Sequence, residues 1–282
     1  MQTTISFRRF LSVATLVWAS AALQVQAHEF WFVPVPSPQP VGQTLPLRLE
    51  VGEFFEGDAA GFSQARTERM YHYTGGKQVD LKPFLSSDSP EAEVLFSLAS
   101  AGTHLLAFDS TPLKITLSSD TFHAYLHDEG LDFVKAQREK AGTADQPGRE
   151  RYHRTVKTLI HAGRLPKSGV STDNTHAVRV GQRLELTPLQ NPFVRAPGQV
   201  LGFQIDFDGK PLAGALVKAW HHRKGQLITI RTRTTAAGRA DFQLPYAGGW
   251  MVSVVHMIPT VNDTEIDWDS YWGNVTFSLP SR

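Results

Sequence analysis

The residues best suited to chemistry in this sequence are its 11 histidines, because the 282-residue chain contains no cysteine. Without thiols the protein has no disulfide, no Cys-ligated zinc or iron–sulfur site and no thiol nucleophile. Imidazole nitrogens, together with carboxylate oxygens, are suitable ligands for divalent transition metals such as nickel, cobalt and copper. No P-loop, Gly-x-Gly-x-x-Gly or Gly-x-Ser-x-Gly motif indicates a competing chemistry.

Residues 1–27 predict a secretory signal peptide. Arg8 and Arg9 precede an apolar stretch over residues 11–23, and Val25 and Ala27 supply small residues at the −3 and −1 positions of a cleavage site. The apolar stretch is too short to span a bilayer, and no later stretch is long enough. We therefore expect export to the periplasm, cleavage after Ala27 and no membrane-spanning segment in the mature chain.

Cleavage after Ala27 makes His28 the first residue of the mature protein. An N-terminal histidine offers its α-amine and its Nδ1 atom, which together close a six-membered chelate ring around one metal ion. The amine has an ordinary pKa of about 7.7–8.0, so a metal ion displaces its proton readily. The aromatic residues Phe30, Trp31 and Phe32 follow after Glu29 and predict a buried first strand that holds the terminus in place.

Two further histidines are candidate metal ligands. His256 follows the apolar stretch Trp250–Val255, and His104 begins an apolar stretch beside the predicted turn 101–103. An ordinary histidine on a strand is the alternative for both of them. The predicted metal ligands are therefore His28, His256 and His104, in that order, and no catalytic residue is assigned.

Short stretches of alternating apolar and polar residues, bounded by Gly, Pro and Ser, predict strands through most of the chain. They include 45–51, 94–98, 104–108, 114–117, 183–186, 200–207, 215–220, 227–231, 240–244, 250–256 and 274–279. The two stretches around residues 101–103 predict a hairpin. We expect a mainly β fold of two β-sandwich domains, Ig-like or transthyretin-like, over residues 28–190 and 191–282.

Residues 119–164 interrupt the strand pattern and predict a two-helix insertion in the first domain. One apolar face follows a possible cap at Ser119, and a second lies before a possible stop at Gly163. The residues of these two faces are Phe122, Tyr125 and Leu126, then Tyr152, Val156, Leu159 and Ile160.

Five motifs in order resemble a family of exported domains of unknown function, usually described as the periplasmic component of cobalt/nickel (ABC-type) transport systems. The motifs are His28-Glu29-Phe30-Trp31, Phe122-x-x-Tyr125-Leu126-x-x-Glu129-Gly130-Leu131, Arg149-Glu150-Arg151-Tyr152-x-Arg154-x-x-Lys157, Gly209-Lys210-Pro211-Leu212-Ala213-Gly214-Ala215-x-Val217 and Trp268-Asp269-Ser270-Tyr271-Trp272. The fourth motif also resembles transthyretin-like and carboxypeptidase-regulatory-like modules. The resemblance implies a periplasmic β-rich protein that handles a divalent transition metal.

These observations predict a non-enzymatic periplasmic metal-binding protein that assists nickel or cobalt uptake, with a membrane metal transporter as its partner. A copper enzyme is one alternative, because an N-terminal histidine on a β-sandwich also resembles the histidine brace of copper-dependent polysaccharide oxygenases. A metal-free binding or adhesion protein is another. The formal net charge of +1 gives no basic field for nucleic acid, and we expect no nucleic-acid partner.

Overall fold

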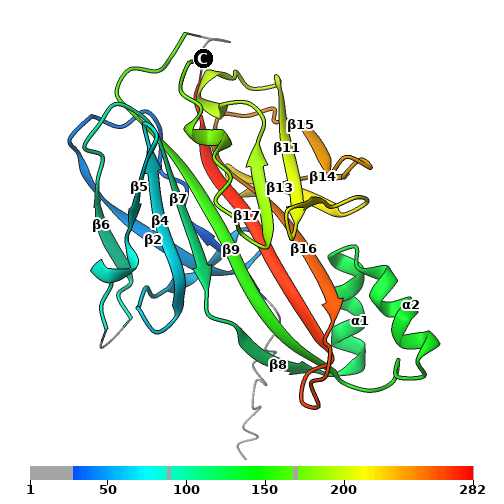
Figure 1. Ribbon diagram of the computed structural model, residues 1–282. Coiled ribbons are helices and arrows are strands. Elements are labelled where there is room, and N and C mark those ends of the chain that lie inside the picture. Colours follow the sequence, from blue (N-terminus) through cyan, green and yellow to red (C-terminus); the bar gives the residue numbers. More distant parts are fainter. Residues whose placement is uncertain (1–27, 88–89, 168–170, 282) are drawn as a thin grey trace, which may run out of the picture.

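The computed structural model describes residues 28–87, 90–167 and 171–281, and shows a mainly β protein with a small helical insertion (Figure 1). The predicted signal peptide lies outside the described residues. No helix in the described part of the chain is long and apolar enough to cross a membrane.

A nine-stranded sheet forms the central layer of the molecule. Its strands in spatial order are β14 (Gln226–Arg233), β13 (Leu216–Arg223), β16 (Gly248–Pro259), β17 (Trp268–Leu279), β9 (Gly148–Ala162), β7 (Gly102–Ser110), β4 (Thr67–Thr74) and β5 (Lys77–Asp80), and β8 (Leu113–Leu117) also pairs with β9. Most neighbours are antiparallel, but β17 and β9 run parallel, with Trp268 opposite Glu150 and Phe277 opposite Leu159. This layer takes strands from both sides of the boundary predicted near residue 190, and that boundary stays a prediction.

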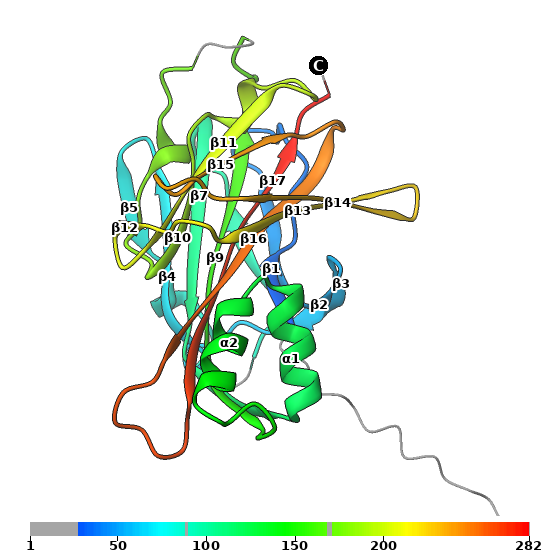
Figure 2. The ribbon, with the colours of Figure 1, turned by 90° about the vertical axis from the view of Figure 1, so that its right-hand side faces the viewer.

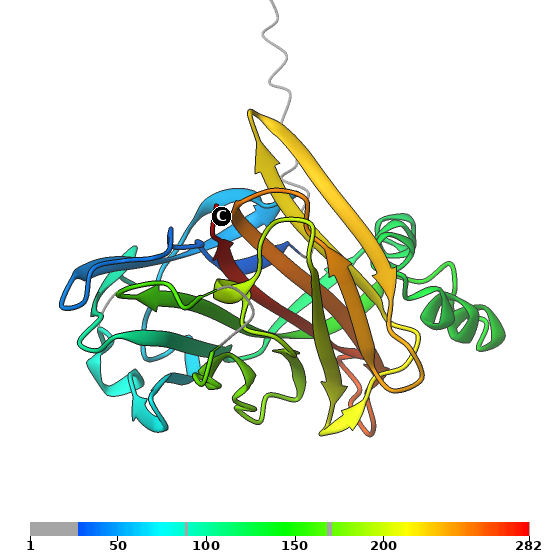
Figure 3. The same cartoon turned by 90° about the horizontal axis from the view of Figure 1, so that it is seen from above.

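Two four-stranded sheets pack against the central layer, and we call them the N-terminal sheet and the C-terminal sheet. The N-terminal sheet comprises β1 (Glu29–Phe32), β2 (Thr44–Glu53), β3 (Glu56–Ala60) and β6 (Glu93–Ser97). The C-terminal sheet comprises β10 (Leu184–Pro188), β11 (Val200–Phe207), β12 (Lys210–Pro211) and β15 (Arg239–Gln243). Seen from above, the blue strands of the N-terminal sheet lie on one side of the molecule, and the gold and orange strands of the C-terminal half, which include β13, β14 and β16 of the central layer, lie on the other (Figure 3).

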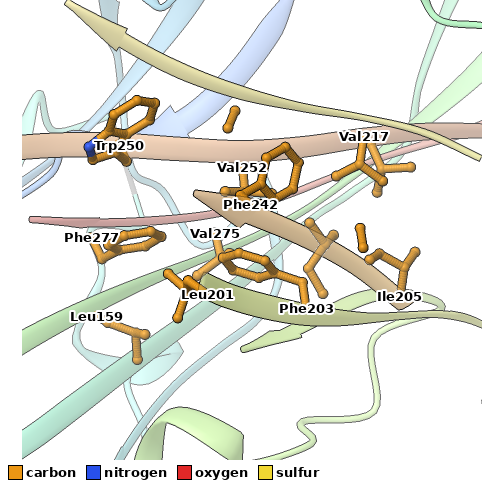
Figure 4. Close-up of a cluster of buried hydrophobic side chains, with 14 of the residues drawn as sticks. Leu159, Leu201, Phe203, Ile205, Val217, Phe242, Trp250, Val252, Val275 and Phe277 are labelled. Atoms are coloured by element: carbon orange, nitrogen blue, oxygen red, sulfur yellow. The ribbon is translucent and has the colours of Figure 1, made fainter. Parts of the chain in front are cut away.

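The two sheets cover opposite faces of the central layer. Neighbouring side chains along its strands point to opposite faces, and they belong to different cores. Leu106 and Ile160 face the N-terminal sheet, and their sequence neighbours Leu105 and Leu159 belong to the core beneath the C-terminal sheet. Figure 4 shows that second core, in which Leu159, Val275 and Phe277 of the central layer meet side chains of β11 and β15. The layered β fold predicted from the sequence is confirmed.

Two helices, α1 (Ser119–Asp128) and α2 (Asp132–Lys140), pack on the same side as the N-terminal sheet, against Val255, Met257 and Trp272. The Ser118 hydroxyl accepts a hydrogen bond from the Thr121 amide and caps α1. Three short 3-10 turns complete the elements, at Lys82–Phe84, Thr175–Ala177 and Pro192–Val194.

The extent predicted for the helical insertion is wrong in its second half. The helices end at Lys140, and residues 148–162 form β9, the central strand between β17 and β7. Both faces of β9 are buried, so Val156 and Ile160 on one face and Leu159 on the other imitate the spacing of an apolar helix face.

The hairpin predicted around residues 101–103 is also wrong. Both strands exist, but β6 pairs with β2 in the N-terminal sheet, and β7 pairs with β4 and β9 in the central layer. The connection therefore crosses between layers, and neither strand's own sequence indicates which partner it takes.

Candidate functional site at the N-terminal strand

A cavity of about 200 Å³ beside β1 brings charged and aromatic side chains together. Its walls come from β1, the β2–β3 hairpin, α1, β13, β14 and β17, and in Figure 2 α1 lies beside that hairpin. The lining residues that carry charge are Glu29, Glu53, Asp128, Glu129, Lys218 and Arg231. The aromatic ones are Phe54, Tyr125, Trp220 and Trp272.

Strand β1 fixes the N-terminal end of this site because it is buried on both faces. Phe30 and Phe32 pack into the core beneath the N-terminal sheet, and Trp31 packs in the other direction against Trp220 and Met251. Glu29 pairs with Gly52 of β2, where a Cβ atom would lie 2.1 Å from the Glu56 carbonyl oxygen. Only glycine allows this close approach, so Gly52 helps to set the position of the hairpin beside the cavity.

Glu29 places a buried carboxyl group at the cavity. The Ser253 hydroxyl donates a 2.9 Å hydrogen bond to Glu29 Oε1, and the Trp220 indole N–H in turn donates to Ser253 at 2.9 Å. Burial, reinforced by the negative charge of Glu129, raises the pKa of Glu29 to about 7 despite the opposing effects of Lys218, Ser253 and Arg154. Perturbed carboxyl groups of this kind are typical of functional sites.

A buried ion pair lies next to this carboxyl group. Lys218 Nζ donates to Glu129 Oε2 at 2.7 Å and lies 5.3 Å from the centre of the Trp220 ring. Burial raises the pKa of the Glu129 carboxyl, and Lys218 partly offsets that effect. The ammonium group of Lys218 is thus paired with the Glu129 carboxylate and lies over the ring of Trp220.

His28 lies at the edge of the same site. Its Nδ1 atom is buried from solvent, has no hydrogen-bond partner and lies 3.5 Å from Glu53 Oε1. The Arg154 guanidinium donates to the His28 carbonyl at 3.4 Å and is held between the rings of Phe30 and Tyr152, each 4.9 Å away. The backbone of residue 28 is therefore fixed, and its imidazole presents a free nitrogen toward a carboxylate.

The turn that carries Glu53 has an unusual backbone. Phe54 and Phe55 are its two central residues, and both have a positive φ, of 55° and 61°. Such a turn normally takes Asn-Gly, since bulky residues are strained in this conformation. Phe55 packs against Trp31, whereas the Phe54 side chain is 59% exposed.

His256, the second predicted ligand, is placed away from this site. Ser253 and His256 are three positions apart on β16, so their side chains leave opposite faces of the sheet. The His256 ring contacts Phe207 of the C-terminal sheet at 4.5 Å, and burial lowers its pKa to about 4, partly offset by Asp208. It lines a separate cavity of about 260 Å³ beside α2. A metal-binding role for His256 stays a prediction.

His104, the third predicted ligand, is buried on β7 with both ring nitrogens engaged. Its Nε2 donates to the Ser100 carbonyl at 2.9 Å, so its Nδ1 accepts from His72 Nε2 at 2.9 Å. Burial lowers the pKa of His104, and burial with the neighbouring His104 lowers the pKa of His72 to about 4. The pair therefore stays neutral at physiological pH, and a metal-binding role for His104 also stays a prediction.

Sequence reasoning missed Glu29, Glu53, Glu129, Lys218 and Arg154, although Glu29, Glu129 and Arg154 lie inside recognised motifs. Glu29 carried a usable signal, because it is an acid at the start of the apolar run Phe30–Phe32. The other residues are brought together only by pairing between distant strands. No group of three or more His, Asp or Glu side chains in the described ranges is arranged to hold a metal ion.

A comparison with protein families matches residues 25–258 to the family described as "Domain of unknown function (DUF4198)". The chain belongs to this family. The match includes β1, the β2–β3 hairpin, both helices, β13 and β14, and therefore every residue that lines the cavity except Trp272 of β17. No curated protein matches the DUF4198 chain.

Proposed function

We propose that this DUF4198 protein is an exported, periplasmic protein that binds a divalent transition-metal ion at its mature N terminus and serves nickel or cobalt uptake. The observation that carries the proposal is the Nδ1 atom of His28, which is buried, has no hydrogen-bond partner and lies 3.5 Å from Glu53 Oε1. A buried polar atom without a partner is costly, and a ligand to that atom removes the cost.

The donor set fits such an ion. Cleavage after Ala27 would give residue 28 a free α-amine, which forms a chelate ring together with Nδ1. The Glu53 carboxylate supplies an oxygen beside that imidazole, and Arg154 holds the His28 carbonyl so that the terminus does not fray. Nitrogen and oxygen ligands of this kind suit Ni²⁺, Co²⁺, Cu²⁺ and Zn²⁺. The uptake role and a membrane transporter as partner are supported by the resemblance of the five motifs.

Calorimetric titration of each of these four ions tests the site. We expect the chain beginning at His28 to bind one ion, and a chain with one additional residue before His28 to bind it at least tenfold more weakly, because its α-amine is lost. Glu53→Gln should weaken binding by a similar factor. Glu93→Gln, an exposed glutamate of the same sheet, is the matched control and should bind like the wild type. Unchanged affinity in the extended chain would refute the N-terminal chelate.

The uptake role requires a separate test in cells. Cells that lack this protein should accumulate less nickel or cobalt, and the wild-type chain and Glu93→Gln should restore accumulation. His28→Ala should fail to restore it. Restoration by His28→Ala at an equal protein level would contradict the proposed role.

A further inference from the structure

We propose that the cavity beside β1 binds a small organic ammonium ion with an apolar body. This inference does not rest on the metal site, because it concerns the interior of the cavity and not the edge where His28 lies. It rests on three features: a buried carboxyl group without an ion-pair partner among the described residues, an excess of acids and an aromatic wall that already holds an ammonium group.

The carboxyl group is that of Glu29, whose side chain is buried at the cavity wall. Its Oε1 atom accepts from Ser253, but none of the ion pairs among the described residues includes Glu29. The nearby Lys218 is engaged by Glu129. A ligand cation beside Glu29 would give this buried carboxyl group the ion-pair partner that no described side chain provides.

The charges of the wall favour a cation over an anion. Four of the lining residues are acids, and two, Lys218 and Arg231, are bases. Lys218 is paired with Glu129. With Glu53 left to the metal site, the remaining charged lining residues are two acids, Glu29 and Asp128, and one base, Arg231. An anionic ligand would meet this excess of negative charge, whereas an ammonium ion would reduce it.

The aromatic wall shows how an ammonium group is accommodated. Lys218 Nζ lies 5.3 Å from the centre of the Trp220 ring, within the range of a cation–π contact. Tyr125 and Trp272 stack on one another at 5.5 Å and add apolar surface to the cavity. Phe54 is exposed at the wall and can cover the apolar part of a ligand.

Phenethylammonium is a suitable probe because it joins a primary ammonium group to an aromatic body, and 3-phenylpropionate is its anionic counterpart. Both are titrated into the metal-free chain beginning at His28, in the presence of a chelator, by calorimetry and by tryptophan fluorescence. We expect one equivalent of phenethylammonium to bind, at least tenfold more tightly than the anion. Equal affinities, or no binding of phenethylammonium at millimolar concentration, would overturn the proposal.

Variants identify the group that recognises the ligand. Glu29→Gln should weaken phenethylammonium binding at least tenfold, whereas Glu93→Gln should leave it unchanged. If Glu29→Gln fails to fold, Asp128→Asn at the end of α1 should still weaken binding severalfold. Wild-type affinity in a folded Glu29→Gln variant, or in Asp128→Asn where Glu29→Gln does not fold, would overturn the inference. The chain extended before His28 should bind the metal ion at least tenfold more weakly but bind phenethylammonium as before, so the two proposals fail independently.

Discussion

Two buried carboxyl groups, those of Glu29 and Glu150, have pKa values raised to about 7. Glu150, at the base of β9, accepts hydrogen bonds from the Ser270 and Tyr125 hydroxyls through Oε1, and its buried Oε2 has no partner. Burial raises the pKa of Glu150 to about 7, although these hydrogen bonds and one from Trp272 oppose the rise. The sequence shows Glu150 only as an acid between two arginines, so its burial could not be predicted from local pattern.

The raised pKa of Glu150 predicts that stability falls as the pH rises. Folding favours the protonated carboxyl, so its contribution is complete below the unfolded pKa and is lost as the pH rises through about 7. Glu29 adds an effect of the same sign. We expect Glu150→Gln to be more stable than the wild type by about 1–3 kcal/mol at pH 8 and similar to it at pH 4.

Urea unfolding at several pH values measures this difference. Glu93→Gln changes an exposed carboxyl group and should follow the wild type throughout. A Glu150→Gln variant whose free energy of unfolding keeps the full pH dependence of the wild type would contradict a raised pKa for Glu150.

At the scale of elements, the sequence predicts most strands well but not their partners. Residues 200–207 form β11 with the predicted bounds, because apolar residues there alternate and Asp208-Gly209 ends the strand. The interpretation of 149–163 as a helix failed because a strand buried on both faces lacks alternation. The cavity could not be predicted either, since its walls come from elements far apart in the sequence.

The turn of the β2–β3 hairpin holds two bulky residues in a strained backbone conformation. Phe54 is exposed and has a φ of 55°, so Phe54→Asn should relieve backbone strain and raise the free energy of unfolding by about 1 kcal/mol. Phe55 has a similar φ, but its ring packs 5.5 Å from that of Trp31. Phe55→Asn should therefore lose packing and give no gain.

Thermal and urea unfolding of the two variants test this contrast. Destabilisation by Phe54→Asn would mean that the exposed ring makes a contribution larger than the strain. A gain in both variants would mean that the contact between Phe55 and Trp31 contributes little.

At the scale of the whole molecule, the central layer joins parts that the sequence predicted as separate domains. Strand β9 also contacts the C-terminal sheet through Lys157, whose Nζ donates to Glu185 Oε1 at 2.6 Å and to the Leu186 carbonyl at 3.1 Å. Both side chains of this ion pair are buried, and burial lowers the pKa of Lys157, partly offset by Glu185. This buried polar contact joins the central layer to the C-terminal sheet.

Removing one partner of this pair should be costly for the whole fold. We expect Lys157→Met to lower the free energy of unfolding by about 3 kcal/mol, because it leaves Glu185 buried without its cation. The double variant Lys157→Met with Glu185→Gln should recover part of the loss. Lys114→Met removes an exposed pair with Glu265 and should change stability little.

Urea unfolding of these variants gives the coupling energy between Lys157 and Glu185. If Lys157→Met and Lys114→Met changed the free energy of unfolding equally, the buried pair would not stabilise the contact between the layers. The same conclusion would follow if the effects of Lys157→Met and Glu185→Gln on the free energy of unfolding simply added in the double variant.

The parallel pairing of β9 with β17 also has a kinetic consequence. The ion pair of Arg151 on β9 with Asp269 on β17 brings together residues 118 positions apart. Such distant contacts slow folding, because a long loop must close before the contacts form. The central layer therefore cannot be completed before β17 has been synthesised. The export proposed above would benefit from this late closure, because passage through a secretion channel requires an unfolded chain.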